Sequence, residues 1–367
     1  MPEKKLIALL FGGRSVEHEV SIRSAASVLV ELESQGWDVL PVAVDLEGRW
    51  FTSEDPLGVR GTDTEGGRIP VSLRAEAEAL LVVGEGRDSR RLQPFLYLPL
   101  IHGQGGEDGN LQGLLELAAA PYAGSGVLAS ALAMDKDRAK AVLRQEGLPV
   151  LDWMTIHAGR WKHSRQVVLD DALQRFPAPV FVKPANGGSS VGISRVSRAD
   201  ELGPALDKAL ALDLKALVEP ALDAREIEVS VLGNEEAEAS IAGEIVPARE
   251  FYDYQAKYDD STTRLLVPAP LEAHEMDRLS SLACATYQAL GCSGFGRIDF
   301  LVERTTGEPF VSEVNTLPGF TDVSMFPALW QASGLEYGAL LARIVNLGRQ
   351  RHEARQGLCY QWGEMPT

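Results

Sequence analysis

Two pairs of polar residues lie at alternating positions in apolar segments near the end of the sequence. Arg297 and Asp299 interrupt one segment, and Glu313 and Asn315 end the next. Residues two apart on a strand point to the same face, so adjacent strands would bring all four side chains together. Carboxylate and amide oxygens suit Mg²⁺, which proteins usually hold with few side chains plus phosphate oxygens. The alternative is a solvated strand face with a surface ion pair, and the two pairs together favour a magnesium site.

A glycine- and serine-rich segment, KPANGGSSVG at 183–192, follows a short apolar run. Glycines let backbone N–H groups approach phosphate oxygens, and serine hydroxyls add donors. Lys183 at the strand end would supply a positive charge for phosphate. The segment lacks the G-K-[ST] ending of a Walker A loop and the G-x-G-x-x-G pattern. Phosphate binding and a flexible hairpin turn therefore both stay open.

Four further residues carry weak signals when each is taken alone. Lys136 begins a predicted helix and by itself is expected to be an exposed lysine. Glu219 precedes Pro220, which holds it extended where it could meet a nucleobase and ribose. Glu17 follows the first strand and could bind an ammonium group or, alternatively, favour a helix N-terminus. His102 also follows a strand, and on its own a structural histidine is the favoured interpretation.

Apolar runs and glycine turns predict the elements that would position these residues. An apolar run at 6–11, a Gly-Gly turn, a helical pattern at 21–35 and a run at 39–44 form a strand–helix–strand unit. Such a unit predicts a parallel sheet. Further strands are predicted at 95–101, 180–183, 216–219, 226–232, 295–302 and 310–314. Further helices are predicted at 110–119, 135–146 and 335–349.

The mixture of helices and strands predicts an α/β (α+β mixed) fold with several domains. The 367 residues suggest two or three domains at about 150 residues each. We interpret the polar segment 47–91 as an insertion with short irregular elements. The first domain is expected to end near residue 124. The polar, tyrosine-containing segment 252–263 is a candidate mobile loop.

The overall composition restricts the partners that this chain could bind. Its net charge of −17, from 35 basic and 52 acidic side chains, disfavours non-specific binding to nucleic acid and anionic lipid. No apolar stretch is long enough to span a membrane, so no membrane insertion is expected. The three cysteines have no metal-type spacing, and so sparse a count fits a reducing cytoplasm.

Taken together, these segments resemble the D-alanine–D-alanine ligase family. The motifs that carry the resemblance occur in the family's order: FGGRSVEHEVS at 11–21, HGQGGEDGNLQG at 102–113, MDK at 134–136, KPANGGSSVG at 183–192, REIEVSVLGN at 225–234, EFYDYQAKY at 250–258, GRIDF at 296–300 and EVNTLPGFT at 313–321. The resemblance implies a three-domain ATP-grasp fold. Its domains would be an N-terminal pre-ATP-grasp α/β domain at 1–124, a central subdomain at 125–219 and a C-terminal catalytic domain at 220–367.

The resemblance also implies the reaction. ATP would phosphorylate the carboxylate of one D-alanine, and the amine of a second D-alanine would attack the acyl phosphate for cell-wall peptidoglycan synthesis. The implied cofactors are ATP and two Mg²⁺ ions, with Mn²⁺ as a possible substitute. The substrates would be D-alanine and ATP, and the protein would be a cytoplasmic homodimer.

For individual residues, the resemblance implies contacts to ATP, to metal and to the two substrates. The implied phosphate-binding lysines are Lys136, Lys183 and Lys257. The implied adenine and ribose contacts are Glu219, Ala221, Leu222 and Glu226. The implied magnesium ligands are Asp299, Glu313 and Asn315. The implied catalytic trio that ties the loop over the site is Glu17, Ser189 and Tyr258, with Glu17 also binding the first ammonium. The remaining implied substrate contacts are His102, Arg297, Gly319, Ser324 and Met325, and here the resemblance reverses the structural interpretation of His102. Arg297 and the Gly319 backbone would stabilise the oxyanion.

Three alternatives remain beside this interpretation. A D-alanyl–D-lactate ligase has the same fold, but a tyrosine at position 258 goes with amine nucleophiles in the family. A non-catalytic nucleotide-binding protein would be expected to lose a metal ligand or phosphate lysine, and every matching position is filled. A dinucleotide-dependent oxidoreductase is disfavoured because the first glycine turn lacks a third glycine. Pro220 and Gln255 depart from the family's usual lysine and acid, and 47–91 matches only its longer members.

Overall fold

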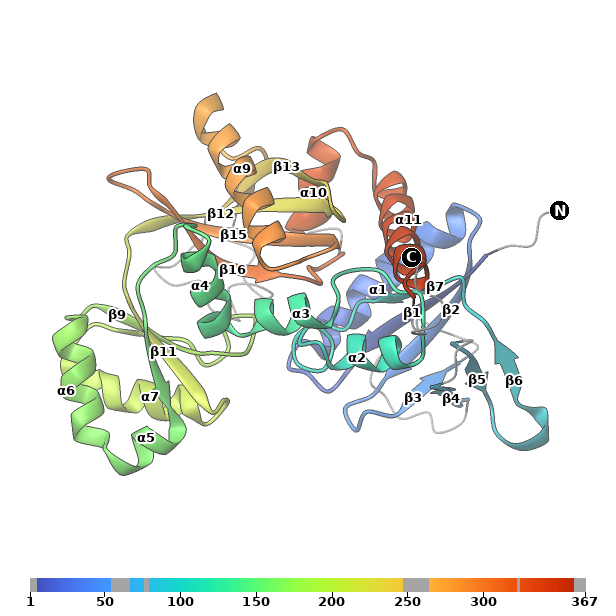
Figure 1. The fold of residues 1–367 in the computed structure, drawn as a ribbon, viewed down its shortest axis with the longest axis horizontal. Helices are drawn as coiled ribbons and strands as arrows, with labels where there is room; N and C mark the ends of the chain where they lie inside the picture. Colours follow the sequence, from blue (N-terminus) through green and yellow to red (C-terminus); the bar gives the residue numbers. More distant parts are fainter. Residues whose placement is uncertain (1–4, 54–66, 76–78, 247–263, 322–323, 360–367) are drawn as a thin grey trace.

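Three β-sheets with helices packed against them make up the protein (Figure 1). The computed structural model describes residues 5–53, 67–75, 79–246, 264–321 and 324–359. In the described part of the chain, the sheets have seven, four and five strands. The predicted α/β fold is therefore confirmed, and the segment expected to form a mobile loop, 252–263, lies outside the described residues.

The first sheet is built around a parallel centre. β1 (Leu6–Gly12) pairs in parallel with β2 (Asp38–Val44) on one side and β7 (Leu96–Pro99) on the other. α1 (His18–Ser34) connects β1 to β2, as the strand–helix–strand pattern predicted. β1 is buried on both faces, which explains why its sequence is continuously apolar and not alternating.

The segment 47–91 extends this sheet by antiparallel pairing, in the order β6-β5-β4-β3-β2-β1-β7. Its four short strands are β3 (Trp50–Thr52), β4 (Ile69–Leu73), β5 (Leu81–Val83) and β6 (Arg90–Leu92), with a 3-10 turn at Gly86–Asp88. The sequence predicted short irregular elements here. Strands of three to five residues are too short for an alternating pattern to be recognised, so their place in the sheet was not foreseen.

The second sheet is antiparallel, in the order β10-β9-β11-β8. Its strands are β8 (Met154–His157), β9 (Val180–Pro184), β10 (Ser194–Val196) and β11 (Lys215–Pro220). Its helical elements are α5 (Ala158–His163), α6 (Arg165–Arg175), the 3-10 helix η2 (Ala199–Glu201) and α7 (Leu202–Leu210). These elements share a core of their own, which includes Ile156, Val168, Val182 and Leu206.

The third sheet is also antiparallel, in the order β14-β13-β12-β15-β16. Its strands are β12 (Ala224–Gly233), β13 (Ala237–Val246), β14 (Arg264–Leu266), β15 (Gly294–Glu303) and β16 (Pro309–Asn315). α9 (Ala273–Ala289) and α10 (Met325–Ala332) pack against β13, and α3 (Val127–Met134) packs against β16. α4 (Lys136–Gln145) follows α3, and α2 (Asn110–Leu117) precedes it.

The last helix, α11 (Tyr337–Gln356), returns to the first sheet and packs against α1 and β7 (Figure 1). It continues past residue 349, where the sequence pattern placed its end. One hydrophobic cluster joins Ile7 and Leu9 of β1, Phe295 of β15 and Ile344 of α11. This core crosses the predicted boundary at residue 124, and the division into domains at 124 and 219 stays a prediction.

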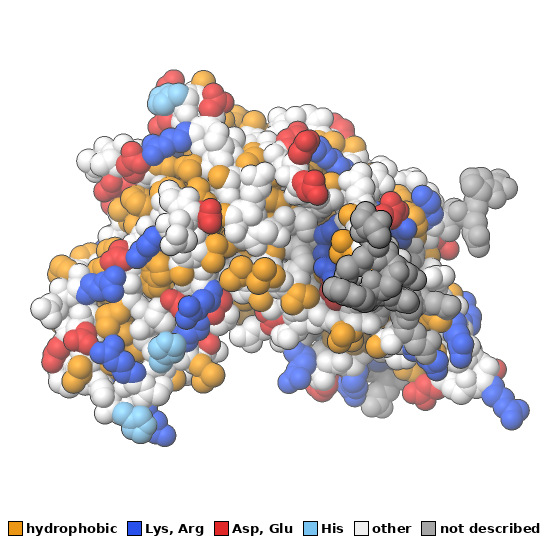
Figure 2. All heavy atoms as spheres, viewed as in Figure 1, with side chains coloured by type: hydrophobic (Ala, Val, Ile, Leu, Met, Phe, Trp, Pro, Cys, Tyr) orange, Lys and Arg blue, Asp and Glu red, His pale blue; other side chains and the backbone are white. Residues whose placement is uncertain are grey.

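The surface carries both signs of charge. Figure 2 shows acidic and basic side chains interspersed over the face that it presents. Among the described residues, no helix is both long and apolar enough to cross a lipid bilayer.

Candidate active site

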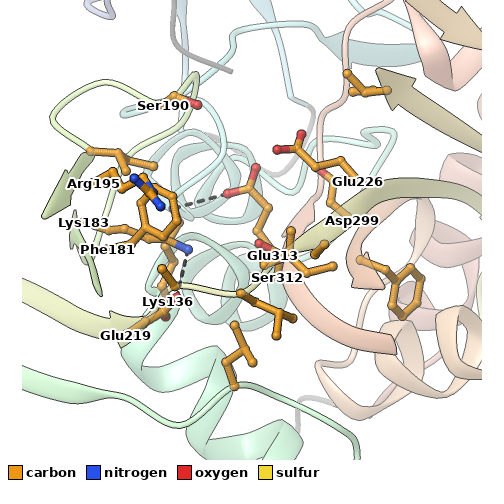
Figure 3. A pocket seen from close by; sticks show the side chains of 18 of the residues that line it. Lys136, Phe181, Lys183, Ser190, Arg195, Glu219, Glu226, Asp299, Ser312 and Glu313 are labelled. Carbon is orange, nitrogen blue, oxygen red and sulfur yellow. Dashed lines mark hydrogen bonds and ion pairs between the residues drawn. The ribbon is translucent and has the colours of Figure 1, made fainter. Parts of the chain in front are cut away.

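A cavity of about 580 Å³ lies between the second and third sheets (Figure 3). β9, β11, β12, β15 and β16 line it, together with the start of α4 and the connection from β11 to β12. Eight residues selected from the sequence are in its lining: Lys136, Lys183, Glu219, Ala221, Leu222, Glu226, Asp299 and Glu313. The structure thus brings together six of the seven residues expected to contact nucleotide, Lys257 lying outside the described residues, and two of the three expected to hold metal.

The acidic wall of this cavity is formed by pairing of β15 with β16. The register places Asp299 opposite Glu313 and Arg297 opposite Asn315, with an irregularity after Asp299. Arg297 donates two hydrogen bonds to the Asp299 carboxylate, each 2.7 Å long. The Asn315 amide donates to the same carboxylate at 2.9 Å. The four polar residues therefore converge, as the spacing on the two strands predicted.

Arg297 is the buried cation of this group, with a side chain that is 15% exposed. Its Nε lies 3.0 Å from a carboxylate oxygen of Glu228 as well as 2.7 Å from Asp299. Burial alone would lower the pKa of this guanidinium, but Asp299 and Glu228 outweigh burial and raise it well above its ordinary value. Arg297 therefore keeps a fixed positive charge against Asp299 and Glu228, which line the cavity.

The oxygen donors suit a hard cation such as Mg²⁺ in type and position. Asp299 and Glu313 face the same cavity from paired positions, and the Asn315 amide can present its oxygen by rotating about its last bond. Among the described residues, no group of three His, Cys, Asp or Glu side chains is arranged to hold a metal. A site here would thus use two carboxylates, an amide and ligands from the substrate.

Two lysines line the other side of the cavity (Figure 3). Lys136 lies at the first turn of α4, whose N-terminus is capped by Asp135. Its Nζ donates to the backbone carbonyl of Gly187 at 2.6 Å and lies 3.4 Å from a Glu313 oxygen. Lys183 is the next-to-last residue of β9, and its Nζ lies 2.8 Å from a Glu219 oxygen. Ammonium groups and carboxylates therefore line one cavity.

Glu219 is almost fully buried on β11, with 2% of its side chain exposed. Burial alone would raise the pKa of its carboxyl, but the charges of Lys183 and Lys140 outweigh burial and lower it to about 2. Beyond Pro220, the Ala221 N–H donates to the Pro179 carbonyl, which fixes the connection that lines the cavity. Both oxygens of Glu219 are engaged by lysines, so the backbone of this segment is better placed than the carboxylate to contact a base.

A second group of predicted residues meets beside the cavity. The Ser189 hydroxyl donates to the carboxylate of Glu17, although the two residues are 172 positions apart. Glu17 is the N-cap residue of α1, but its side chain makes no capping hydrogen bond. The backbone of Gly103 packs closely against the Glu17 side chain. Only glycine fits there, because a Cβ on residue 103 would lie 2.7 Å from a Glu17 oxygen. The trio's third member, Tyr258, and the loop lysine Lys257 lie outside the described residues.

His102 is buried beside this pair and is held by the fold at both ring nitrogens. Its Nδ1 donates to the Leu317 carbonyl at 2.8 Å, and its Nε2 lies 3.2 Å from the Ser24 hydroxyl. Burial lowers the pKa of the imidazole, which favours the neutral ring. These contacts fit the structural interpretation of His102, since a substrate would have to displace Ser24 to reach Nε2.

The residues expected around the second substrate are in the segment after β16. The Ser324 hydroxyl accepts a hydrogen bond from the Thr321 N–H at 3.0 Å. A Cβ on Gly319 would lie 2.8 Å from the Ser324 hydroxyl oxygen, so glycine allows the close packing of these two residues. Met325, in contrast, is 4% exposed and packs in a small core with Ile245.

Three titratable residues at this site were not selected from the sequence, the buried Glu228 and Lys140 and the half-buried Glu107. Glu228 pairs with Arg297, and its position two residues after Glu226 on a strand was the available signal. Lys140 pairs with Glu219, and its spacing of four from Lys136 on a helix was the signal. Glu107 accepts hydrogen bonds from the Gly103 and Leu317 N–H groups. Burial raises the Glu107 pKa to about 8, and nothing in its sequence motif indicated this.

Family models decide the relationship of this chain to known proteins. The model described as D-ala D-ala ligase N-terminus matches residues 6–125, and the model described as D-ala D-ala ligase C-terminus matches residues 142–346. The chain belongs to the D-alanine–D-alanine ligase family. The predicted family and its ATP-grasp fold are confirmed.

Named members of the D-alanine–D-alanine ligase family resemble this chain over nearly its whole length. The D-alanine–D-alanine ligase of Heliobacterium modesticaldum is 44% identical over 356 residues, which is 96% of this chain and 97% of the relative. That of Geobacillus thermodenitrificans is 40% identical and covers 97% of this chain and 99% of its own.

Solved structures agree with the sequence relatives. The D-alanine–D-alanine ligase from Coxiella burnetii superimposes with a TM-score of 0.84 at 33% identity, and 96% of each chain is covered. The VanG D-Ala:D-Ser ligase from Enterococcus faecalis gives the same TM-score at 32% identity, covering 94% of this chain and all of its own. The names of these two similar structures thus specify different second substrates.

Proposed function

We propose that this protein joins two D-alanines in an ATP-dependent reaction that passes through an acyl phosphate. The observation that carries the proposal is the position of the Lys136 Nζ, 3.4 Å from Glu313 in a cavity that Lys183 and Asp299 also line. Phosphoryl transfer depends mainly on positioning and charge neutralisation, and this arrangement of charges suits both. The full-length similarity to named D-alanine–D-alanine ligases supports the same activity.

In this proposal, each side of the cavity has a separate task. Lys136 and Lys183, with Lys257 from the undescribed loop, bind the phosphates. Asp299, Glu313 and Asn315 would hold Mg²⁺, which when bound neutralises phosphate charge. The backbone and side chains near Ala221, Leu222 and Glu226 hold adenine and ribose.

On the substrate side, Glu17 binds the ammonium of the first D-alanine and is oriented by Ser189. Arg297 and the Gly319 backbone stabilise the oxyanion that forms during attack. Ser324 and the backbone at Met325 bind the second carboxylate. Tyr258 completes the contact between loop and site, and the loop 252–263 excludes water from the acyl phosphate.

The biological setting is part of the same proposal. The product would enter peptidoglycan synthesis in the cytoplasm, and the protein would act as a homodimer. A pre-ATP-grasp domain would end near residue 124, and the central and catalytic domains would meet near residue 219.

Phosphate release with ATP and Mg²⁺ tests the activity, measured with and without D-alanine. We expect release that depends on D-alanine, with the dipeptide as product, and its absence would refute the proposal. Competition of D-alanine with D-lactate or D-serine then tests the second substrate. Preferential ester formation would indicate the D-alanyl–D-lactate alternative, and preferential D-serine incorporation would indicate the specificity named for the Enterococcus faecalis structure.

A further inference from the structure

A buried lysine stands behind the phosphate side of the cavity without lining it. Lys140 lies one turn after Lys136 on α4, so both side chains point from the same face of the helix. Only 4% of the Lys140 side chain is exposed, and Lys140 is absent from the residues that line the cavity. A lysine is rarely buried to this extent unless it is paired, so its partner indicates its role.

That partner is Glu219, which holds two lysines at once. Its two carboxylate oxygens lie 2.8 Å from the Nζ of Lys140 and 2.8 Å from the Nζ of Lys183. Lys140 is fixed in this position by a hydrogen bond of 3.1 Å to the Leu151 carbonyl and by the Trp153 ring, whose centroid is 5.5 Å away. The chain Lys140–Glu219–Lys183 therefore runs from the interior to the cavity wall.

The net charge of these three residues determines how much positive charge Lys183 presents to the cavity. Two ammonium groups and one carboxylate leave one net positive charge, and Lys183 is the ammonium that lines the cavity, beside Glu219. Without Lys140, Glu219 would neutralise Lys183 completely in a buried setting where solvent screens little. Both Glu219 oxygens would also be free to turn toward Lys183 and draw it from the cavity.

We infer that Lys140 is a positioning residue, which keeps the charge of Lys183 available to the phosphates of the nucleotide by occupying the second oxygen of Glu219. This inference deepens the proposed function and rests on it for the identity of the nucleotide. Burial lowers the pKa of the Lys140 ammonium despite the opposing charge of Glu219, with Lys183 acting in the same direction as burial. The Lys140 ammonium is therefore buried although burial removes its hydration at a cost in free energy. Such a cost is expected at a functional site, where a buried charge has a specific role.

Lys140→Met tests the inference, because methionine keeps an unbranched apolar stem and removes the charge. Calorimetry on the purified chain with Mg²⁺ would measure the dissociation constants of ADP and of adenosine, which has no phosphate. We expect ADP to bind about ten-fold more weakly, as for the loss of one charge-assisted contact. Adenosine binding should change less than about two-fold, because base and ribose contacts remain.

Arg144→Met is the matched control on the same helix. Arg144 also stacks on Trp153, at 4.0 Å from the ring centroid, but pairs with Asp152 and not with Glu219. This variant should leave both dissociation constants within about two-fold of the parent. If Lys140→Met does not fold, Lys140→Gln tests the loss of charge alone, since its neutral amide can still donate to Glu219 and Leu151. ADP should again bind more weakly than adenosine does, because Glu219 then neutralises Lys183.

Unchanged ADP affinity in the folded variant would overturn the inference. Equal weakening of ADP and adenosine would also overturn it, because a purely structural lysine would distort the whole cavity. D-alanine-dependent phosphate release by the parent chain, measured in parallel, separates the two proposals. If that release is absent while the ADP difference is present, the ligase assignment fails and the role of Lys140 stands.

Discussion

Asp299 is already bound by protein donors at the wall of the cavity. Arg297 and Asn315 together donate three hydrogen bonds to its carboxylate. A carboxylate that is fixed in this way loses little conformational freedom when it binds a cation. The same donors compete with a metal ion for the oxygens of the Asp299 carboxylate. The negative charge of Asp299 is therefore needed for the metal ion to bind in their presence.

Asp299→Asn should therefore weaken Mg²⁺ binding by at least about 10- to 100-fold, since the shape remains and the charge is lost. A Mg²⁺ titration of D-alanine-dependent phosphate release measures this shift. Glu308→Gln, at an exposed acid paired with Arg278, is the control and should titrate like the parent. An unchanged Mg²⁺ requirement in Asp299→Asn would show that another carboxylate holds the metal.

Ser189→Ala should raise the KM for D-alanine by about ten-fold, because Glu17 loses the hydroxyl that orients it. Steady-state kinetics at saturating ATP measures the change. Ser190→Ala is the control, since both serines have a positive φ, 51° and 56°, and so share any backbone strain. Equal changes in the D-alanine KM of the two variants would count against a specific role for Ser189.

Glu219→Gln tests the electrostatics of the buried carboxyl through pH. The Glu219 pKa is lowered from its ordinary 4.5 to about 2, so its contribution to stability is present above pH 4.5. As the pH falls from 4.5 toward about 2, the unfolded chain binds a proton that the folded chain lacks, and the contribution is lost.

The free energies of unfolding of the parent and of Glu219→Gln should thus differ most near neutral pH and converge toward about pH 2. Denaturant titrations at several pH values measure this difference. A difference that stayed constant over the same pH range would contradict a charged Glu219 in the folded state.

At the scale of the elements, α4 positions two lysines of the site, Lys136 and Lys140. The Asp135 carboxylate accepts from the Arg138 N–H and caps the helix, and it also pairs with Lys215 of β11. Asp135→Ala should lower the free energy of unfolding by at least about 1 kcal/mol through loss of the cap. Asp135→Asn keeps a capping oxygen and should lose less. Denaturant titration checks the order of the two variants, and equal losses would argue against a capping role.

The elements that the sequence predicted are those with a strong local pattern. β1 is continuously apolar, and α4 ends just before Gly147, with Pro149 beyond it, so both could be located from the local sequence. β13 was not predicted, although it lies within the third sheet and pairs with β12 over most of its length. Its sequence, AEASIAGEIV, is rich in alanine and glutamate, and pairing with neighbouring strands outweighs these weak local preferences.

The site was predictable from sequence to different extents. Alternation on β15 and β16 was enough to group Arg297, Asp299, Glu313 and Asn315. The contact of Glu17 with Ser189 had no local signal and was expected only from the resemblance to a family. Lys140 was missed because its burial depends on β11, which lies far away in the sequence.

At the scale of the whole molecule, α11 completes the core that begins with β1. Ile344 is fully buried in the cluster that also contains Ile7 and Leu98 of the first sheet. Ile344→Ala should lower the free energy of unfolding by about 2–5 kcal/mol, because it removes buried methyl groups and leaves a cavity. Gln350→Ala, at an exposed position of the same helix, should change it by less than about 0.5 kcal/mol. Thermal or denaturant unfolding measures both, and a small effect at Ile344 would argue against this packing.

The return of α11 to the first sheet has a consequence for the newly made protein. During synthesis, β1, α1 and β2 emerge from the ribosome long before the residues of α11 are translated. Until then the apolar surface that Leu340 and Ile344 later cover stays open to water and to chaperones. The packing of β1, α1 and β2 can therefore be completed only after α11 has been synthesised.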